Sequence, residues 1–175
     1  MLRDFNLIAT TARGNERQMV HELLYLLRET LEDEAAEASK TGIRGLVTAK
    51  TSLNPLEVIT KFRTILQDRP YEFRYALRII PVQRIVRTDL EQIKCAAHEL
   101  SVEIRENESF RVTVEKRFTE LHAKDLIEAV ATDIQNKVDL EKPNKILLVE
   151  VLGKVTGLSL MEPDGILNVL QEKMM

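Results

Sequence analysis

The sequence predicts an α+β fold made of two successive units. Apolar residues recur at helical spacing in some segments and alternate with polar residues in others, and the two patterns interchange along the whole chain. With 175 residues, 44% of them apolar, the chain can form one large domain or two small ones. The stretch 81–87 reads as a linker, so we place a domain boundary between residues 82 and 83.

The first unit, residues 1–82, reads as strand, helix, strand, helix, strand. We expect strands at residues 5–10, 46–50 and 71–79, and helices beginning after Asn15 and Asn54. Asn15 and Gln18 match a capping box, and Asn54 precedes a proline, which favours the first position of a helix. The acidic residues 32–37 are expected to form a solvated helix end or loop. This order of elements resembles a ferredoxin-like half-sandwich.

The second unit, residues 83–175, reads as helix, strand, helix, strand, strand. We expect helices at residues 88–100 and 123–137 and strands at residues 110–117, 146–152 and 155–160, followed by a short terminal helix within 163–175. Thr88 and Glu91 match a capping box at the start of the first helix. Gly153 and Lys154 suit a two-residue type II′ turn between the last two strands, which form a hairpin after the turn at Pro143.

The charged residues are unevenly distributed along the chain. The net charge is −3, yet residues 40–94 hold 11 basic and 5 acidic side chains, while both flanking segments are net acidic. A basic segment of this kind is either a solvated face or a surface that attracts an anionic partner. On sequence pattern alone, the two alternatives are about equal.

The residue patterns give little support to catalysis. Cys95 falls in the middle of a predicted helix near its inward face, which is typical of a small core residue. The three histidines lie in separate segments without metal-ligand spacing. Residues 45–51 lack the second glycine that a phosphate-binding loop needs. We therefore expect no catalytic residue, no metal and no cofactor.

The composition also bears on the compartment. No apolar run approaches the ~20 residues of a membrane span, and the N-terminus lacks the apolar core of a signal peptide. A single cysteine excludes an internal disulfide framework. We expect a cytoplasmic protein with no membrane partner.

A set of polar side chains in the second unit predicts a nucleic-acid interface. They flank the linker, project from the strand at 110–117 or occupy the turns around the final hairpin, and we expect them to ring one cleft. The candidates are Arg84, Arg87, Arg111, Lys116, Arg117, Lys142, Asn144 and Lys154. Arginine presents a planar fork that suits phosphate, and each phosphate contact makes binding salt-dependent.

Residues ~85–165 resemble a THUMP domain, an RNA-binding module of tRNA-modifying enzymes. The resemblance rests on Ser109–Arg117, on the segment Val138–Asn144 with its proline turn, and on the hairpin that ends in Gly157–Leu160. Residues 1–82 are similar to the ferredoxin-like domain that precedes it in that family. The resemblance implies an α+β fold with an N-terminal ferredoxin-like domain followed by an α/β THUMP domain. It supports RNA contacts by position for Arg111, Lys116, Arg117, Lys142 and Asn144.

The resemblance further implies that the two domains hold the acceptor stem and 3′ CCA end of tRNA. Because the given sequence leaves no room for a catalytic domain, we expect the stand-alone subgroup. Within that subgroup, the chain resembles the archaeal and eukaryotic RNA-binding adaptor that delivers tRNA to a separate cytidine N4-acetyltransferase. The segment Thr10–Glu16 fits this subgroup. The alternatives are a small tRNA-modifying enzyme and a dimerising scaffold that does not bind RNA. A homodimer is compatible with all three.

Overall fold

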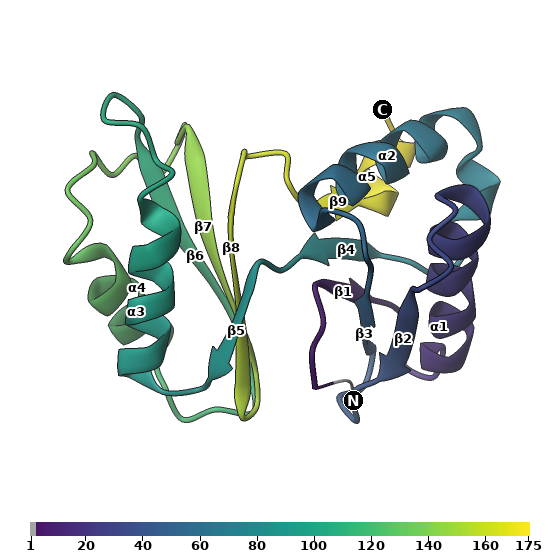
Figure 1. The fold of residues 1–175 in the computed structure, drawn as a ribbon, viewed down its shortest axis with the longest axis horizontal. Coiled ribbons are helices and arrows are strands. Elements are labelled where there is room, and N and C mark those ends of the chain that lie inside the picture. Colours follow the sequence, from purple (N-terminus) through teal and green to yellow (C-terminus); the bar gives the residue numbers. More distant parts are fainter. Residues whose placement is uncertain (1–2) are drawn as a thin grey trace. The chain divides into compact units, whose positions relative to one another are not determined.

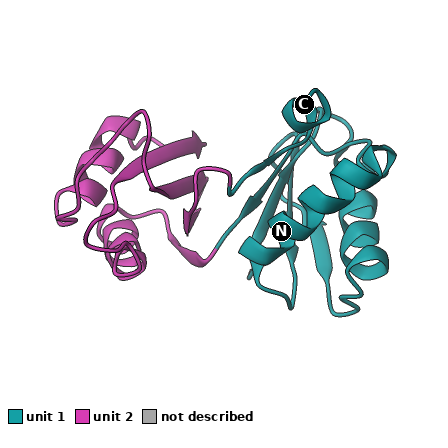
Figure 2. Ribbon diagram, turned by 90° about the horizontal axis from the view of Figure 1, so that it is seen from above, with its two compact units in different colours: residues 1–82, 165–175 teal, residues 83–164 magenta. Residues whose placement is uncertain are grey.

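The computed structural model describes residues 3–175 and divides the chain into two compact units (Figure 2). Unit 1 comprises the chain up to Val82 together with Gly165–Met175, and unit 2 comprises Gln83–Asp164. The C-terminal segment, which we expected within the second domain, therefore belongs to unit 1. The physical reason is strand pairing, since Ile79 of unit 1 pairs with Leu167 in an antiparallel ladder.

Unit 1 is an antiparallel sheet with its helices packed on one face (Figure 1). Its elements are β1 (Leu7–Thr10), α1 (Glu16–Tyr25), the π-helical turn η1 (Leu26–Thr30), β2 (Glu37–Lys40), β3 (Leu46–Lys50), α2 (Pro55–Asp68), the 3-10 turn η2 (Pro70–Glu72), β4 (Arg78–Pro81), β9 (Leu167–Asn168) and α5 (Val169–Lys173). The strand order is β2-β3-β1-β4-β9. The first six major elements, β-α-β-β-α-β, confirm the ferredoxin-like prediction and add β2, which the sequence pattern did not identify.

A buried carboxylate explains why the expected strand at 71–79 is mostly irregular. Glu22 of α1 accepts hydrogen bonds from the backbone N–H groups of residues 74–76, at 2.7 to 3.1 Å. These N–H groups are thereby satisfied by a side chain instead of a neighbouring strand. The ladder with β1 begins only at Arg78, so the prediction is wrong for residues 71–77.

The carboxylates of Glu16 and Asp33 form hydrogen bonds that the sequence did not predict. Asn15 makes no side-chain capping bond, so the predicted capping box is absent. Instead, the carboxylate of Glu16 accepts hydrogen bonds from the N–H groups of Gly45 at 2.7 Å and Gly14 at 2.9 Å, and these bonds lower its pKa. Asp33, in the acidic run expected to be solvated, is buried and accepts hydrogen bonds from Ser52 N–H and Ser52 Oγ at 2.9 and 2.6 Å.

Unit 2 is a four-stranded sheet with α3 and α4 on one face (Figure 1). Its elements are β5 (Arg84–Arg87), α3 (Leu90–Ser101), β6 (Phe110–Arg117), α4 (Ala123–Ala131), β7 (Lys145–Leu152) and β8 (Val155–Met161). The strand order is β5-β8-β7-β6; β6 runs parallel to β7, and the other neighbouring pairs are antiparallel. The core between helices and sheet includes Ile93, Phe110, Leu126, Leu147 and Leu158.

The local expectations for unit 2 are largely met. The strand Phe110–Arg117 is confirmed, and the two-residue turn at Gly153 and Lys154 joins β7 to β8. The expected linker at 81–87 differs, because Arg84–Arg87 pair with β8 as an edge strand. The cap of α3 is Asp89, which accepts the N–H of Gln92 at 3.1 Å, and not Thr88. The helix at 123–137 ends early, at Ala131.

Candidate nucleic-acid interface

The sheet of unit 2 places the predicted residues in separate locations. One end of the sheet contains the last residues of β5, β6 and β7 and the first residue of β8. There the strand register pairs Arg117 with Leu152, Leu152 with Val155, and Val155 with Arg87. We call this end the hairpin edge. Four of the predicted residues lie there: Arg87, Lys116, Arg117 and Lys154.

The remaining predicted residues lie elsewhere in the unit. Lys142 and Asn144 occupy the loop 138–144 before β7, at the opposite end of the sheet, and Arg111 lies near that end of β6. Seven register steps separate the two ends, roughly 23 Å at about 3.3 Å per residue. Arg84 lies on the outer strand β5 beside the middle of β8. The residues expected to ring one cleft are therefore divided among the two ends of the sheet and the middle of its outer strand.

Backbone hydrogen bonds hold the three loops of the hairpin edge together. The N–H of Thr88 donates to the carbonyl of Lys154, and the N–H of Gly153 donates to the carbonyl of Arg117, both at 2.8 Å. The hydroxyls of Thr88 and Thr156 are also within hydrogen-bond distance, at 2.9 Å. The turn between β7 and β8 is thus fixed on both sides, to β5 and to β6.

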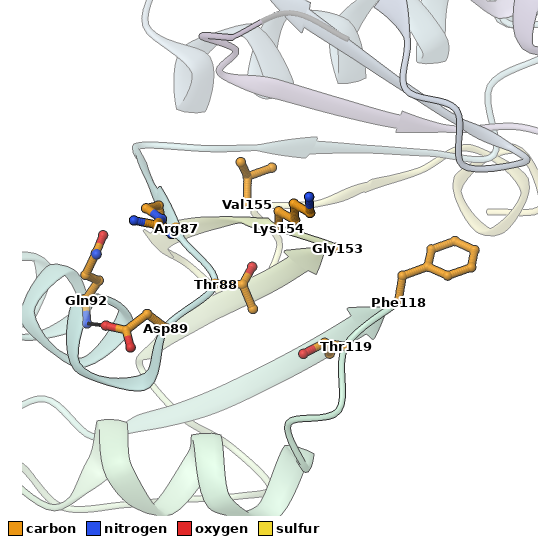
Figure 3. A pocket seen from close by; sticks show the side chains of 9 residues that line it. All are labelled: Arg87, Thr88, Asp89, Gln92, Phe118, Thr119, Gly153, Lys154 and Val155. Atoms are coloured by element: carbon orange, nitrogen blue, oxygen red, sulfur yellow. Dashed lines mark hydrogen bonds between the residues drawn. The ribbon is translucent and has the colours of Figure 1, made fainter.

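The same loops enclose an open pocket of about 840 Å³ (Figure 3). Nine residues from three segments line it: Arg87, Thr88, Asp89, Gln92, Phe118, Thr119, Gly153, Lys154 and Val155. Arg87 and Lys154 are exposed, and neither side chain has a hydrogen bond or ion pair within residues 3–175. The carboxylate of Asp89 is engaged in capping α3. The pocket therefore offers two available cations, a combination suited to an anionic ligand.

Phe118 is a functional candidate that the sequence patterns missed. Its side chain is 79% exposed and its φ is +55°, a left-handed conformation that bulky residues rarely adopt. In Figure 3 the ring projects outward from the end of β6. The alternation of β6 would have placed position 118 on the core side with Phe110 and Val112, so only the backbone geometry reveals its exposure. The available signal was an aromatic residue directly after two cations.

The two remaining cations of the hairpin edge, Lys116 and Arg117 at the end of β6, differ from each other. Lys116 is exposed, and its ammonium has no hydrogen-bond or ion-pair partner in the described part of the chain. Arg117 donates through Nη1 to Oε2 of Glu150 on the neighbouring strand, at 2.9 Å, and Glu150 is buried. Arg117 is thus committed to an ion pair within the sheet, and Lys116 is the available charge.

At the opposite end of the sheet, most polar groups stabilise the loop 138–144. Arg111 donates to the carbonyl of Leu140 at 3.0 Å, and the side-chain oxygen of Asn144 accepts the N–H of Ser109 at 2.8 Å. Asp139 accepts the N–H groups of Lys142 and Glu141, bonds that lower the pKa of its carboxyl group. The side chain of Lys142 is exposed. Arg111 and Asn144 therefore position the loop, and Lys142 is its available cation.

Cys95 differs from the expectation that it faces the core. It is an exposed free thiol on α3, because the helix directs Ile93, Ala96 and Ala97 inward instead. Arg84, on the adjacent strand, lies 3.9 Å from the carboxylate of Glu99 in an exposed pair. An exposed pair of this length contributes little to stability.

Within residues 3–175, no three or more histidine, cysteine, aspartate or glutamate side chains are grouped so that they could hold a metal ion. None of the helices in this range is both long and apolar enough to cross a membrane.

Comparison with protein families identifies the second unit. Residues 87–161 match the model of the THUMP domain, so the chain contains a THUMP domain. The match begins at Arg87 and ends at Met161, the last residue of β8, and it includes the whole hairpin edge. An uncharacterized protein of Methanocaldococcus jannaschii is 25% identical over 171 residues, which cover 95% of this chain and 43% of that protein.

Solved structures share the fold over most of the chain. PH1313 from Pyrococcus horikoshii superimposes with a TM-score of 0.61 at 18% identity, over 91% of this chain and 55% of its own. TrmN from Thermus thermophilus gives 0.60 at 18% identity, over 90% and 45%. A 4-thiouridine synthetase, solved in complex with RNA and ATP, gives 0.53 at 16% identity, over 91% and 42%. The chain spans about half the length of these relatives, and at such identities the likeness establishes the fold.

Proposed function

We propose that this chain is a tRNA-binding protein and that the hairpin edge of unit 2 is its main contact with RNA. The observation that carries the proposal is the pocket at the hairpin edge, where Arg87 and Lys154 are exposed without partners in the described residues and Lys116 adds a third available cation nearby. Phosphate contacts need such uncompensated charges, because a cation already paired with a carboxylate gains little from a phosphate.

The comparisons support RNA as the anionic partner. The pocket lies within the THUMP domain, and a structure of similar fold was determined as a complex of a 4-thiouridine synthetase with RNA. The protein as a whole has a net charge of −3, so attraction to RNA must come from a local surface. We infer that this surface contacts the acceptor stem and the unpaired 3′ CCA end, where bases are accessible without entering the deep RNA groove.

The test is tRNA affinity measured across a salt series by fluorescence anisotropy. The double variant Arg87→Ala/Lys154→Ala should bind more weakly, and its slope of log affinity against log salt should fall by roughly 0.7 to 0.9 for each phosphate that is no longer neutralised. The double variant Lys61→Ala/Lys124→Ala, at exposed lysines on α2 and α4 outside the hairpin edge, removes the same number of charges and should retain the wild-type slope. Equal effects of the two replacements would contradict a role for the hairpin edge.

We further propose that the chain presents tRNA to a separate modification enzyme, a cytidine acetyltransferase, without itself catalysing the reaction. The residue patterns that argue against a catalytic site support this role. The test is to incubate tRNA and acetyl donor with the chain, with the acetyltransferase, and with both. Modification should require the enzyme and increase when the chain is added. Modification by the chain alone would overturn the adaptor role.

A homodimer is a separate prediction, which light scattering tests by measuring the molar mass of the chain in solution.

A further inference from the structure

The backbone conformation of Phe118 is unfavourable, and packing of its side chain does not compensate for it. Of the aromatic residues in the described range, it is the most exposed, at 79%, followed by Tyr71 at 69%. Its left-handed backbone, with φ at +55°, disfavours any residue that has a Cβ atom. A glycine or asparagine would adopt the same conformation more easily. A strained conformation at an exposed aromatic residue points to a role in binding.

The surrounding backbone holds Phe118 in this position. The preceding residue, Arg117, accepts the N–H of Gly153 through its carbonyl at 2.8 Å and forms the ion pair with buried Glu150. The Cβ of Phe118 lies 4.0 Å from the position that a Cβ at Gly153 would take. The backbone and Cβ of Phe118 therefore belong to a fixed part of the hairpin edge, immediately beside the turn that carries Lys154.

The combination of groups at this pocket matches an unpaired nucleotide. An exposed ring offers a flat apolar face to a base, while Arg87 and Lys154 line the same pocket and are available for the phosphates. We propose that Phe118 stacks against an unpaired base of the bound RNA, while Arg87 and Lys154 contact the adjoining phosphates. This inference rests on the proposed function and names the part of the RNA that the site takes. Stacking is tolerant of sequence, because every base has a π face.

The test compares three variants on two RNAs. One RNA is tRNA with its intact 3′ end, and the other carries abasic nucleotides in the unpaired tail, so the phosphates are kept and the bases are removed. Phe118→Leu keeps an apolar side chain without a ring, and Phe118→Tyr keeps the ring. Phe118→Gly removes the ring and also relieves the backbone conformation, so it should not lower the unfolding temperature.

The expected result is coupling between the ring and the bases. Wild type and Phe118→Tyr should bind intact tRNA about tenfold or more tighter than the abasic RNA, as expected for a stacked base. Phe118→Leu and Phe118→Gly should lack this preference, binding intact tRNA as weakly as wild type binds the abasic RNA. The salt slope should stay unchanged in all three variants, because the phosphate contacts remain.

Three outcomes would overturn the inference. Phe118→Leu could retain the wild-type preference for intact RNA, or it could weaken binding of both RNAs equally, which would make Phe118 a residue that shapes the loop. If either result for Phe118→Leu is found while Arg87→Ala/Lys154→Ala still weakens RNA binding, the proposed function stands and the stacking inference alone fails. If wild type binds neither RNA in a salt-dependent manner, both fail.

Discussion

At the scale of single residues, the partners of an arginine distinguish a structural role from a binding role. Arg87 and Arg117 both lie at the hairpin edge, and the sequence marked both as candidates for RNA binding. Arg87 is exposed without a partner among the described residues, whereas Arg117 is paired with the buried carboxylate of Glu150 at 2.9 Å. The two should therefore respond differently to the same replacement.

We expect Arg117→Ala to lower the free energy of unfolding by about 1.5 to 3 kcal/mol, because it removes the partly exposed cation that pairs with the buried carboxylate of Glu150. Arg87→Ala, the matched control, should change it by less than about 0.5 kcal/mol, as is usual for exposed positions. Urea denaturation followed by circular dichroism measures both. A smaller decrease for Arg117→Ala than for Arg87→Ala would contradict the structural role of Arg117.

Asp33 should make the stability of unit 1 depend on pH. Burial alone would raise its pKa, but the hydrogen bonds from Ser52 and Thr51 outweigh burial and lower the pKa in the folded state. A lowered folded pKa means that the unfolded state binds protons more readily. The stability contributed by Asp33 is then fully present above the unfolded pKa of about 3.9 and is lost as pH falls through the folded pKa.

The measurement is the unfolding free energy of wild type and Asp33→Asn between about pH 3 and pH 6, in the window below and above that unfolded pKa. Wild type should be the more stable at the upper end, and the difference should shrink as the solution is acidified. A difference that stays constant over the whole range would show that protonation of Asp33 is not coupled to folding.

At the scale of elements, the connection between β2 and β3 is held against the end of β1. The N–H of Thr11 donates to the carbonyl of Gly45 at 2.9 Å, and the N–H of Gly45 donates to Glu16. Gly45 has a φ of +76°, and a Cβ added there would lie 2.7 Å from the carbonyl oxygen of Thr11. This close approach requires glycine.

Gly45→Ala should therefore destabilise the protein by at least about 2 kcal/mol, because it adds a backbone clash to the left-handed conformation. Gly42→Ala is a matched control in the same connection, since Gly42 has a φ of +85° but open space around it. Its cost should be the backbone term of about 1 to 2 kcal/mol alone. Equal decreases in unfolding free energy for the two variants would contradict the importance of the Thr11 contact.

The sequence predicted the elements in which apolar residues recur with a clear period. The alternation at Phe110–Arg117 and the glycine turn after Leu152 predicted β6 and the hairpin correctly. It missed β2, whose polar residues form an edge strand without an apolar period. It also overextended the strand before Arg78, because the satisfaction of that backbone by Glu22 depends on a contact 52 to 54 residues away.

The candidate site was predictable only in part. Charge and turn positions identified Arg87 and Lys154, which the structure places around one pocket. They could not reveal that the predicted cations occupy opposite ends of the sheet, because that division follows from the pairing register. The exposure of Phe118 depends on one backbone angle, which no periodic pattern encodes.

At the scale of the whole molecule, the chain leaves unit 1, forms unit 2 and returns. The returning segment adds Leu167 and Val169 to the core of unit 1. It also places Glu172 within 2.6 Å of Arg63, and Lys173 within 2.7 Å of the carbonyl of Phe73. The stability of unit 1 should therefore depend on residues that follow unit 2 in the sequence.

A chain shortened to end at Asp164 should be less stable in unit 1 and equally stable in unit 2. Burial of Leu167 and Val169 alone is worth about 3 kcal/mol or more by area. Amide hydrogen exchange should show faster exchange in β1 and β4, with β7 as the internal reference that remains protected. Unchanged protection in β1 would mean that the returning segment is dispensable.

We propose that the hairpin edge binds the unpaired 3′ end of tRNA. The most direct measurement is the affinity of the full chain for two otherwise identical tRNAs, one intact and one trimmed of its CCA nucleotides, at the same salt concentration. If the hairpin edge binds this end, the intact tRNA binds at least about tenfold more tightly than the trimmed tRNA, and Arg87→Ala/Lys154→Ala reduces that difference. Equal affinities for the two tRNAs in wild type would contradict it.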